Sequence, residues 1–167
     1  MTFDDVNALS ASDFAAKFGH LFEHSPWVIE AAALHRPFAD KHAMLDAFAS
    51  VLEGAGDDRR LALLRAHPEL AGKAAIDRSL TKESTAEQAS AGLDRLTEEE
   101  FKLFHERNAA YAQKFGFPFV ICVRLTTKIG ILEAMRTRLG STRDVEFQAA
   151  LGEVMKIVDL RLEEALQ

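Results

Sequence analysis

The stretch TEEEFKLFHERNAAYAQKFG, residues 97–116, contains the clearest structural signal in the chain. Thr97 is a favourable N-cap, three glutamates follow it in what would be the first helical turn, and Gly116 can adopt the left-handed conformation that ends helices. Between these ends, apolar side chains recur at spacings of about three and four residues. The stretch therefore predicts a long amphipathic α-helix.

The same helical periodicity extends over most of the 167 residues, whereas the alternation typical of strands is nearly absent. Two short helices are expected near the N-terminus, capped by Ser12 and by Ser25, with Pro26 at the first helical position. Longer helices are predicted at about 40–53, 57–66, 84–96, 128–139 and 143–166. The sequence thus predicts an all-α fold, a single compact domain over residues 1–167 with about seven to nine helices.

One segment breaks this pattern. FGFPFVICVR, residues 115–124, is apolar, contains Pro118 and is too isolated to build a sheet. We expect an extended apolar segment that crosses the core. Its unpaired backbone N–H and C=O groups would suit a flat, amide-rich heterocycle, and plain core packing is the alternative.

Composition excludes several classes of protein. The net charge is −6 and no basic run is present, so a nucleic acid partner is not expected. No apolar stretch is long enough to span a membrane, and the acidic N-terminus has no leader-like features. Cys122 is the single cysteine, which rules out a disulfide within the chain and fits a cytoplasmic protein. His20 and His24 have helical i,i+4 spacing but lack a third ligand, so no metal site is predicted.

His67 is the first candidate for chemistry. In LRAHPEL, residues 64–70, a helical run meets His67 and then Pro68, which forces the chain out of the helix. An imidazole at a helix C-terminus has its protonated form stabilised by the helix dipole. This placement suits a stabilising helix cap as well as a proton donor.

Glu87 and Arg161 also have two interpretations each. STAEQ, residues 84–88, has the form of a capping box in which Ser84 and Glu87 bond to each other's backbone. Alternatively, Glu87 turns towards a pocket shared with His67, across the irregular stretch 68–83. Arg161 has two interpretations: it forms an ion pair, with Glu164 or with a residue of another helix, or it binds an anionic group of the substrate.

Several motifs together resemble one family. They are SPW at 25–27, RPF at 36–38, HPELAGKAA at 67–75, STAEQ at 84–88, FGFPFVICVR at 115–124 and KIVDLRLEEAL at 156–166. In order and spacing they resemble the 2-oxo-4-hydroxy-4-carboxy-5-ureidoimidazoline (OHCU) decarboxylases of the ureide pathway. The stretch LTTKIGIL, residues 125–132, which follows FGFPFVICVR, is more apolar than is usual in the family.

The resemblance implies an all-helical homodimer that converts OHCU into (S)-allantoin and carbon dioxide without a metal or an organic cofactor. The family's catalytic residues fall on His67 and Glu87. Its substrate-binding residues fall on Pro68, Ser84, Thr85, Ala86, Glu87, Gln88, Phe119, Val120, Ile121, Cys122, Val123 and Arg161. Two other functions remain open from the residues themselves: a helical protein-interaction module, and a hydrolase of a related cyclic ureide.

Because no set of metal ligands is evident, we predict that EDTA leaves the rate of (S)-allantoin formation unchanged. The measurement compares turnover before and after dialysis against the chelator. A loss of rate that one particular divalent metal restores would contradict the prediction.

Overall fold

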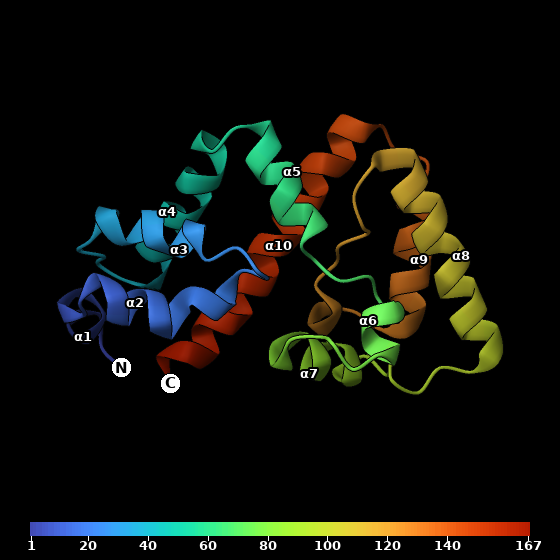
Figure 1. The fold of residues 1–167 in the computed structure, drawn as a ribbon, viewed down its shortest axis with the longest axis horizontal. Helices are drawn as coiled ribbons and strands as arrows, with labels where there is room; N and C mark the ends of the chain where they lie inside the picture. Colours follow the sequence, from blue (N-terminus) through green and yellow to red (C-terminus); the bar gives the residue numbers. More distant parts are fainter. The chain divides into compact units, whose positions relative to one another are not determined.

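The computed structural model describes all 167 residues and is built from helices (Figure 1). It contains no β-strand. The α-helices are α1 (Phe3–Ala8), α2 (Ala11–Phe18), α3 (Trp27–Ala32), α4 (Lys41–Gly54), α5 (Asp57–Arg65), α6 (Lys73–Ile76), α7 (Lys82–Ser90), α8 (Glu98–Phe115), α9 (Lys128–Arg138) and α10 (Arg143–Leu166). Three 3₁₀ turns accompany them: η1 (Gly19–Leu21), η2 (Ala33–His35) and η3 (Val123–Leu125). The prediction of an all-α fold is confirmed, and no helix is long and apolar enough to cross a bilayer.

Several predicted helix ends match the structure. Thr97 caps α8 in a reciprocal capping box with Glu100, and Gly116 ends that helix at φ +81°, a conformation that favours glycine. Other N-caps differ from prediction. Ser10, not Ser12, caps α2, because its hydroxyl oxygen accepts the N–H of Asp13. Pro26, rather than Ser25, occupies the N-cap position of α3.

The apolar segment is shorter than the predicted range 115–124. Phe115 belongs to the last turn of α8, and Val123 and Arg124 belong to η3. Residues 118–122 carry no helix or strand and are mostly buried. The non-helical part is therefore confined to a few residues around Pro118 and the chain that follows it.

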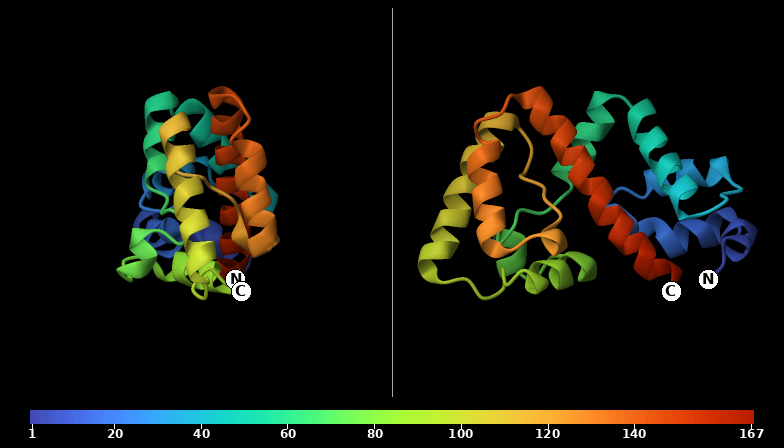
Figure 2. Two further views of the ribbon diagram at one scale, coloured as in Figure 1. Left: turned by 90° about the vertical axis from the view of Figure 1, so that its right-hand side faces the viewer. Right: turned by 180° about the vertical axis from the view of Figure 1, so that it is seen from behind.

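The chain divides into two compact units. The first contains residues 1–66 and 154–167, and the second contains residues 67–153. In the first unit, α3 packs on α4 and α2. Its buried core includes the tilted rings of Phe14 and Phe18, 4.9 Å apart, and Phe22 edge-on to Phe48 at 5.7 Å. Both chain ends lie in this unit, where the terminal amine donates to the Leu166 carbonyl at 2.9 Å (Figure 2).

The second unit is organised around α8, which lies beside α9 (Figure 1). Its aromatic core is centred on the buried Tyr111, whose ring lies 4.6 Å from that of Phe115 and 5.2 Å from that of Phe119. Phe117 bridges this cluster to Phe147 of α10 at 5.9 Å. Aromatic rings from two helices thus enclose the segment 117–119.

The capping box of α8 should contribute measurably to the stability of the protein. Thr97→Ala should lower the free energy of unfolding by about 1 kcal/mol, because the N–H of Glu100 loses its acceptor. The measurement is urea unfolding followed by circular dichroism. Thr137→Ala is the control, since Thr137 is exposed in the last turn of α9 and does not cap a helix N-terminus. Equal stability of the two variants would contradict the assignment.

Candidate functional site

The loop that follows His67 is held by side chains from α7 and α8. The Ala71 N–H donates to Oε1 of Gln88 at 3.0 Å, and Nε2 of Gln88 donates to the Glu69 carbonyl at 3.4 Å. Ala71 has a φ of +51°, a left-handed conformation that costs a non-glycine residue about 1 kcal/mol. The Gln88 amide therefore stabilises a strained turn next to His67, which is itself 9% exposed.

Asn108 of α8 completes this arrangement. Its side chain is 3% exposed, and Nδ2 donates to the Leu70 carbonyl at 2.8 Å. Loop residues 69–71 thus have three backbone groups bonded to two buried amide side chains. Buried backbone outside a helix needs such partners, because an unsatisfied group costs about 1–3 kcal/mol.

The structure corrects the interpretation of STAEQ as a capping box. The N-cap of α7 is Thr81, whose hydroxyl oxygen accepts the N–H of Ser84 at 3.2 Å. Ser84 is therefore the third residue of the helix, and Glu87 lies in the helix interior, where it cannot close a box. Sequence reasoning missed this because Thr81 and Ser84 both fit an N-cap, and only tertiary packing decides between them.

Glu87 lies near the segment that follows Pro118. Helix α7 contacts η3, and the negative charges of Glu153 and Glu87 both raise the pKa of the Cys122 thiol, after burial, which is the largest cause. Cys122 is thus held as a neutral thiol and is unsuited to act as a nucleophile. The loop after His67 and the segment at Cys122 both adjoin α7, which brings predicted site residues from three parts of the sequence to one helix.

Residues 119–122 are anchored from two helices. Arg138 of α9 donates from Nη1 to the Val120 carbonyl at 2.8 Å, and the Cys122 N–H donates to Oε1 of Glu153 at 3.3 Å. Between these anchors, the N–H and C=O of Ile121 have no partner within the protein. A donor and an acceptor on adjacent peptide units are thus available at one residue, as recognition of a cyclic amide requires.

The predicted site residues differ in their accessibility. Pro68, Glu87 and Ile121 are partly exposed, whereas Thr85 and Ala86 are exposed. His67, Ser84, Gln88, Phe119, Val120, Cys122, Val123 and Arg161 are buried. The Phe119 ring packs against Tyr111 and under the Arg138 guanidinium at 4.4 Å, so its side chain is part of the core. Of the three residues 119–121, only Ile121 is partly exposed.

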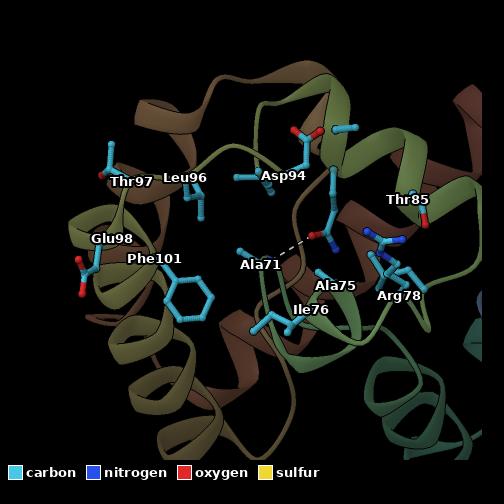
Figure 3. Close-up of a pocket in the computed structure, with 14 residues that line it drawn as sticks. Ala71, Ala75, Ile76, Arg78, Thr85, Asp94, Leu96, Thr97, Glu98 and Phe101 are labelled. Atoms are coloured by element: carbon cyan, nitrogen blue, oxygen red, sulfur yellow. Dashed lines mark hydrogen bonds between the residues drawn. The ribbon is translucent and has the colours of Figure 1, made fainter.

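A groove of about 690 Å³ lies on another face of α7 (Figure 3). Ile76, Leu96 and Phe101 gather around it, and the dashed line at Ala71 is the bond to Gln88. Thr85 lines this groove and donates its hydroxyl to the Thr81 carbonyl at 2.8 Å. Because residues two apart on a helix do not face the same way, Thr85 and Glu87 do not share a pocket through their side chains.

Arg161 belongs to the first unit. Its Nη2 donates to Oε1 of Glu23 at 2.9 Å, and its Nη1 donates to the carbonyls of His20 and Leu21, both at 3.3 Å. Both charged side chains are buried, at 3% and 1% exposure. Arg161 is therefore an ion-pair partner, but of Glu23 in the turn between η1 and α3 rather than of a residue in another helix, and contact with substrate stays a prediction.

No three side chains of histidine, cysteine, aspartate or glutamate gather into a group suited to a metal ion. Beside α7 lie instead the partly exposed Glu87 carboxylate, the Ile121 peptide with its unpaired polar groups, and the loop bonded to Gln88, which follows the buried His67. Such a combination is typical of an enzyme site that uses proton transfer and hydrogen bonding.

Comparison with known proteins agrees with this class. The family model of OHCU decarboxylase matches residues 7–163. The 2-oxo-4-hydroxy-4-carboxy-5-ureidoimidazoline decarboxylase of Haloferax volcanii is 40% identical over 98% of this chain and 95% of its own length. The enzyme of the same name from Amia calva is 39% identical over 100% of this chain and 95% of its own. A crystal structure of (S)-allantoin synthase superposes with a TM-score of 0.79 at 28% identity, over 99% of this chain and 54% of that one.

The fold is all-helical, and the relatives that match it over nearly their full length are decarboxylases. The chain belongs to the OHCU decarboxylase family. Sequence reasoning missed three residues that hold the irregular segments in place, namely Asn108, Arg138 and Glu153. Each lies in a helix whose apolar pattern gives no sign that a polar side chain points inward.

We predict that Gln88→Leu lowers the free energy of unfolding by about 1–3 kcal/mol, because the buried Ala71 N–H loses its acceptor. Urea unfolding measures the change. The matched control is Gln113→Leu, an exposed position on α8 that should change stability by less than about 0.5 kcal/mol. If both variants were as stable as the parent, the role of Gln88 in holding the loop would be wrong.

Proposed function

We propose that this chain catalyses the decarboxylation of OHCU to (S)-allantoin and carbon dioxide in urate degradation, as a carboxy-lyase that needs no cofactor. The proposal rests on one arrangement in a member of this family. The loop after His67, the carboxylate of Glu87 and the unpaired peptide groups of Ile121 come together at α7. We assign catalysis to His67 and Glu87, and binding to the segments that contain Pro68, Ser84–Gln88 and Phe119–Val123, together with Arg161.

The chemistry breaks one carbon–carbon bond. The bond between C4 and the carboxylate cleaves, carbon dioxide leaves, and the electron pair remains in the ring until a proton adds to one face. His67 exchanges a proton with the C4 hydroxyl, and Glu87 orients the imidazole and engages the ureido group. The mostly buried surroundings disfavour a localised carboxylate charge relative to the delocalised transition state. Protonation from one side gives the (S) product.

Binding would use the peptide groups that the protein leaves open. The Ile121 N–H and C=O can pair with a carbonyl and an N–H of the hydantoin-like ring. Neutral backbone groups recognise such a ring without adding charge near the departing carboxylate. The neutral Cys122 thiol beside them leaves the reaction without a competing nucleophile.

Three wider assignments belong to this proposal. A single domain over residues 1–167 is supported by the family model, which runs through both units, and one calorimetric unfolding transition would agree with it. A homodimer is supported by the family resemblance and is tested by sedimentation equilibrium. A cytoplasmic location is supported by the single cysteine, which permits no disulfide within the chain, and is tested by cell fractionation.

The test of function is release of carbon dioxide and optically active allantoin from freshly generated OHCU. His67→Asn and Glu87→Gln should each lower turnover by two or more orders of magnitude with little change in melting temperature, because a positioned acid–base group contributes about that much. His105→Asn and Glu106→Gln, exposed on α8, are the matched controls and should keep full turnover.

Parent protein that produces no carbon dioxide above the spontaneous rate would contradict the proposed function. Ring opening without carbon dioxide release would indicate the hydrolase instead. A Glu87→Gln variant with normal turnover and (S) selectivity would remove Glu87 from the mechanism.

A further inference from the structure

Arg138 uses all three of its guanidinium nitrogens inside the second unit. Nε donates to Oε1 of Glu146 at 2.7 Å, Nη1 donates to the Val120 carbonyl at 2.8 Å, and Nη2 donates to the Tyr111 hydroxyl at 3.4 Å. The Tyr111 hydroxyl in turn donates to Oε1 of Glu146 at 2.7 Å. The group therefore links α8, α9 and α10 to the non-helical residue Val120.

This network is largely removed from water. The Glu146 side chain is 2% exposed and that of Arg138 is 15% exposed, and the guanidinium lies over the Phe119 ring at 4.4 Å. A buried ion pair seldom stabilises a fold more than apolar packing of the same volume would. The Arg138–Glu146 pair has a definite geometric effect, because a planar guanidinium with three fixed partners has little freedom to move.

Because Arg138 fixes the Val120 carbonyl by a hydrogen bond, it also fixes the direction of the Ile121 N–H. The Val120 C=O and the Ile121 N–H belong to one planar peptide unit, and in a trans peptide they point in opposite directions. Arg138 on one side therefore directs the Ile121 N–H to the other side. In the next peptide unit, the bond from the Cys122 N–H to Glu153 directs the Ile121 C=O in the same manner.

We propose that Arg138, held by Glu146 and Tyr111, is a positioning residue that orients the Ile121 peptide groups for binding of the substrate ring. The inference rests on the proposed function, since it names residues that act on the same site without touching the substrate. It adds an element that the family's motifs do not contain, because Arg138 and Glu146 lie outside every motif that carries the resemblance.

The test compares Arg138→Met and Arg138→Lys with Arg136→Met. Arg136 lies on the same helix, is 65% exposed and pairs only with Glu133. Arg138→Met should raise KM for OHCU roughly tenfold, the effect of misaligning one or two neutral hydrogen bonds, with kcat lowered less than threefold. Arg138→Lys keeps the charge but cannot reach all three partners, so it should show an intermediate KM. Arg136→Met should match the parent in both constants.

Binding of (S)-allantoin gives a readout without turnover. Its Kd, followed by NMR titration, should rise roughly tenfold in Arg138→Met and remain near the parent value in Arg136→Met. Should Arg138→Met fail to fold, Tyr111→Phe removes a single hydroxyl from the network and should still raise KM several-fold. A folded Arg138→Lys or Tyr111→Phe with the parent's KM and Kd, and only a lower melting temperature, would overturn the proposal. An inactive parent would instead refute the proposed function.

Discussion

Backbone that is buried outside a helix must find hydrogen-bond partners among side chains, and in an all-α protein no strand is present to supply them. Two stretches of this chain face that constraint, the loop 69–71 and the segment 118–122. Gln88 and Asn108 satisfy the first, and Arg138 and Glu153 contribute to the second. These bonds connect α7, α8, α9 and α10 of the second unit to the two irregular stretches, because each helix contributes one of the four side chains.

The same constraint accounts for the chemistry of the site. Helices keep their own polar backbone groups occupied, so only irregular chain can offer an unpaired N–H and C=O at one residue, as Ile121 does. Hydrogen bonds at the neighbouring residues Val120 and Cys122 hold the segment in place and leave the Ile121 N–H and C=O unpaired. His67 precedes the other irregular stretch, whose backbone is held by Gln88 and Asn108. The helices thus hold in place the groups to which we assign catalysis and binding, which lie outside the helices or on α7.

Helix periodicity and caps were sufficient to predict the all-α fold and the ends of α8, α9 and α10, because local propensity and packing agree there. The N-cap of α7 was predicted wrongly, since two hydroxyl residues competed and local pattern does not decide between them. His67 and Glu87 were singled out from their local sequence, where a structural and a functional interpretation stayed open, and the family resemblance assigned them catalytic roles that remain predictions. Arg138 and Glu146 could not be found, because charged residues in a helix normally face solvent and nothing local distinguishes an inward one.

The central claim is that substrate binds at α7 between the His67 loop and the Ile121 peptide. A crystal structure of the protein soaked with (S)-allantoin tests it most directly. The account predicts product density within hydrogen-bond distance of the Ile121 N–H and C=O, with Glu87 at the ureido group. Density in the groove lined by Ile76, Leu96 and Phe101, or at any place without contact to Ile121, would contradict it.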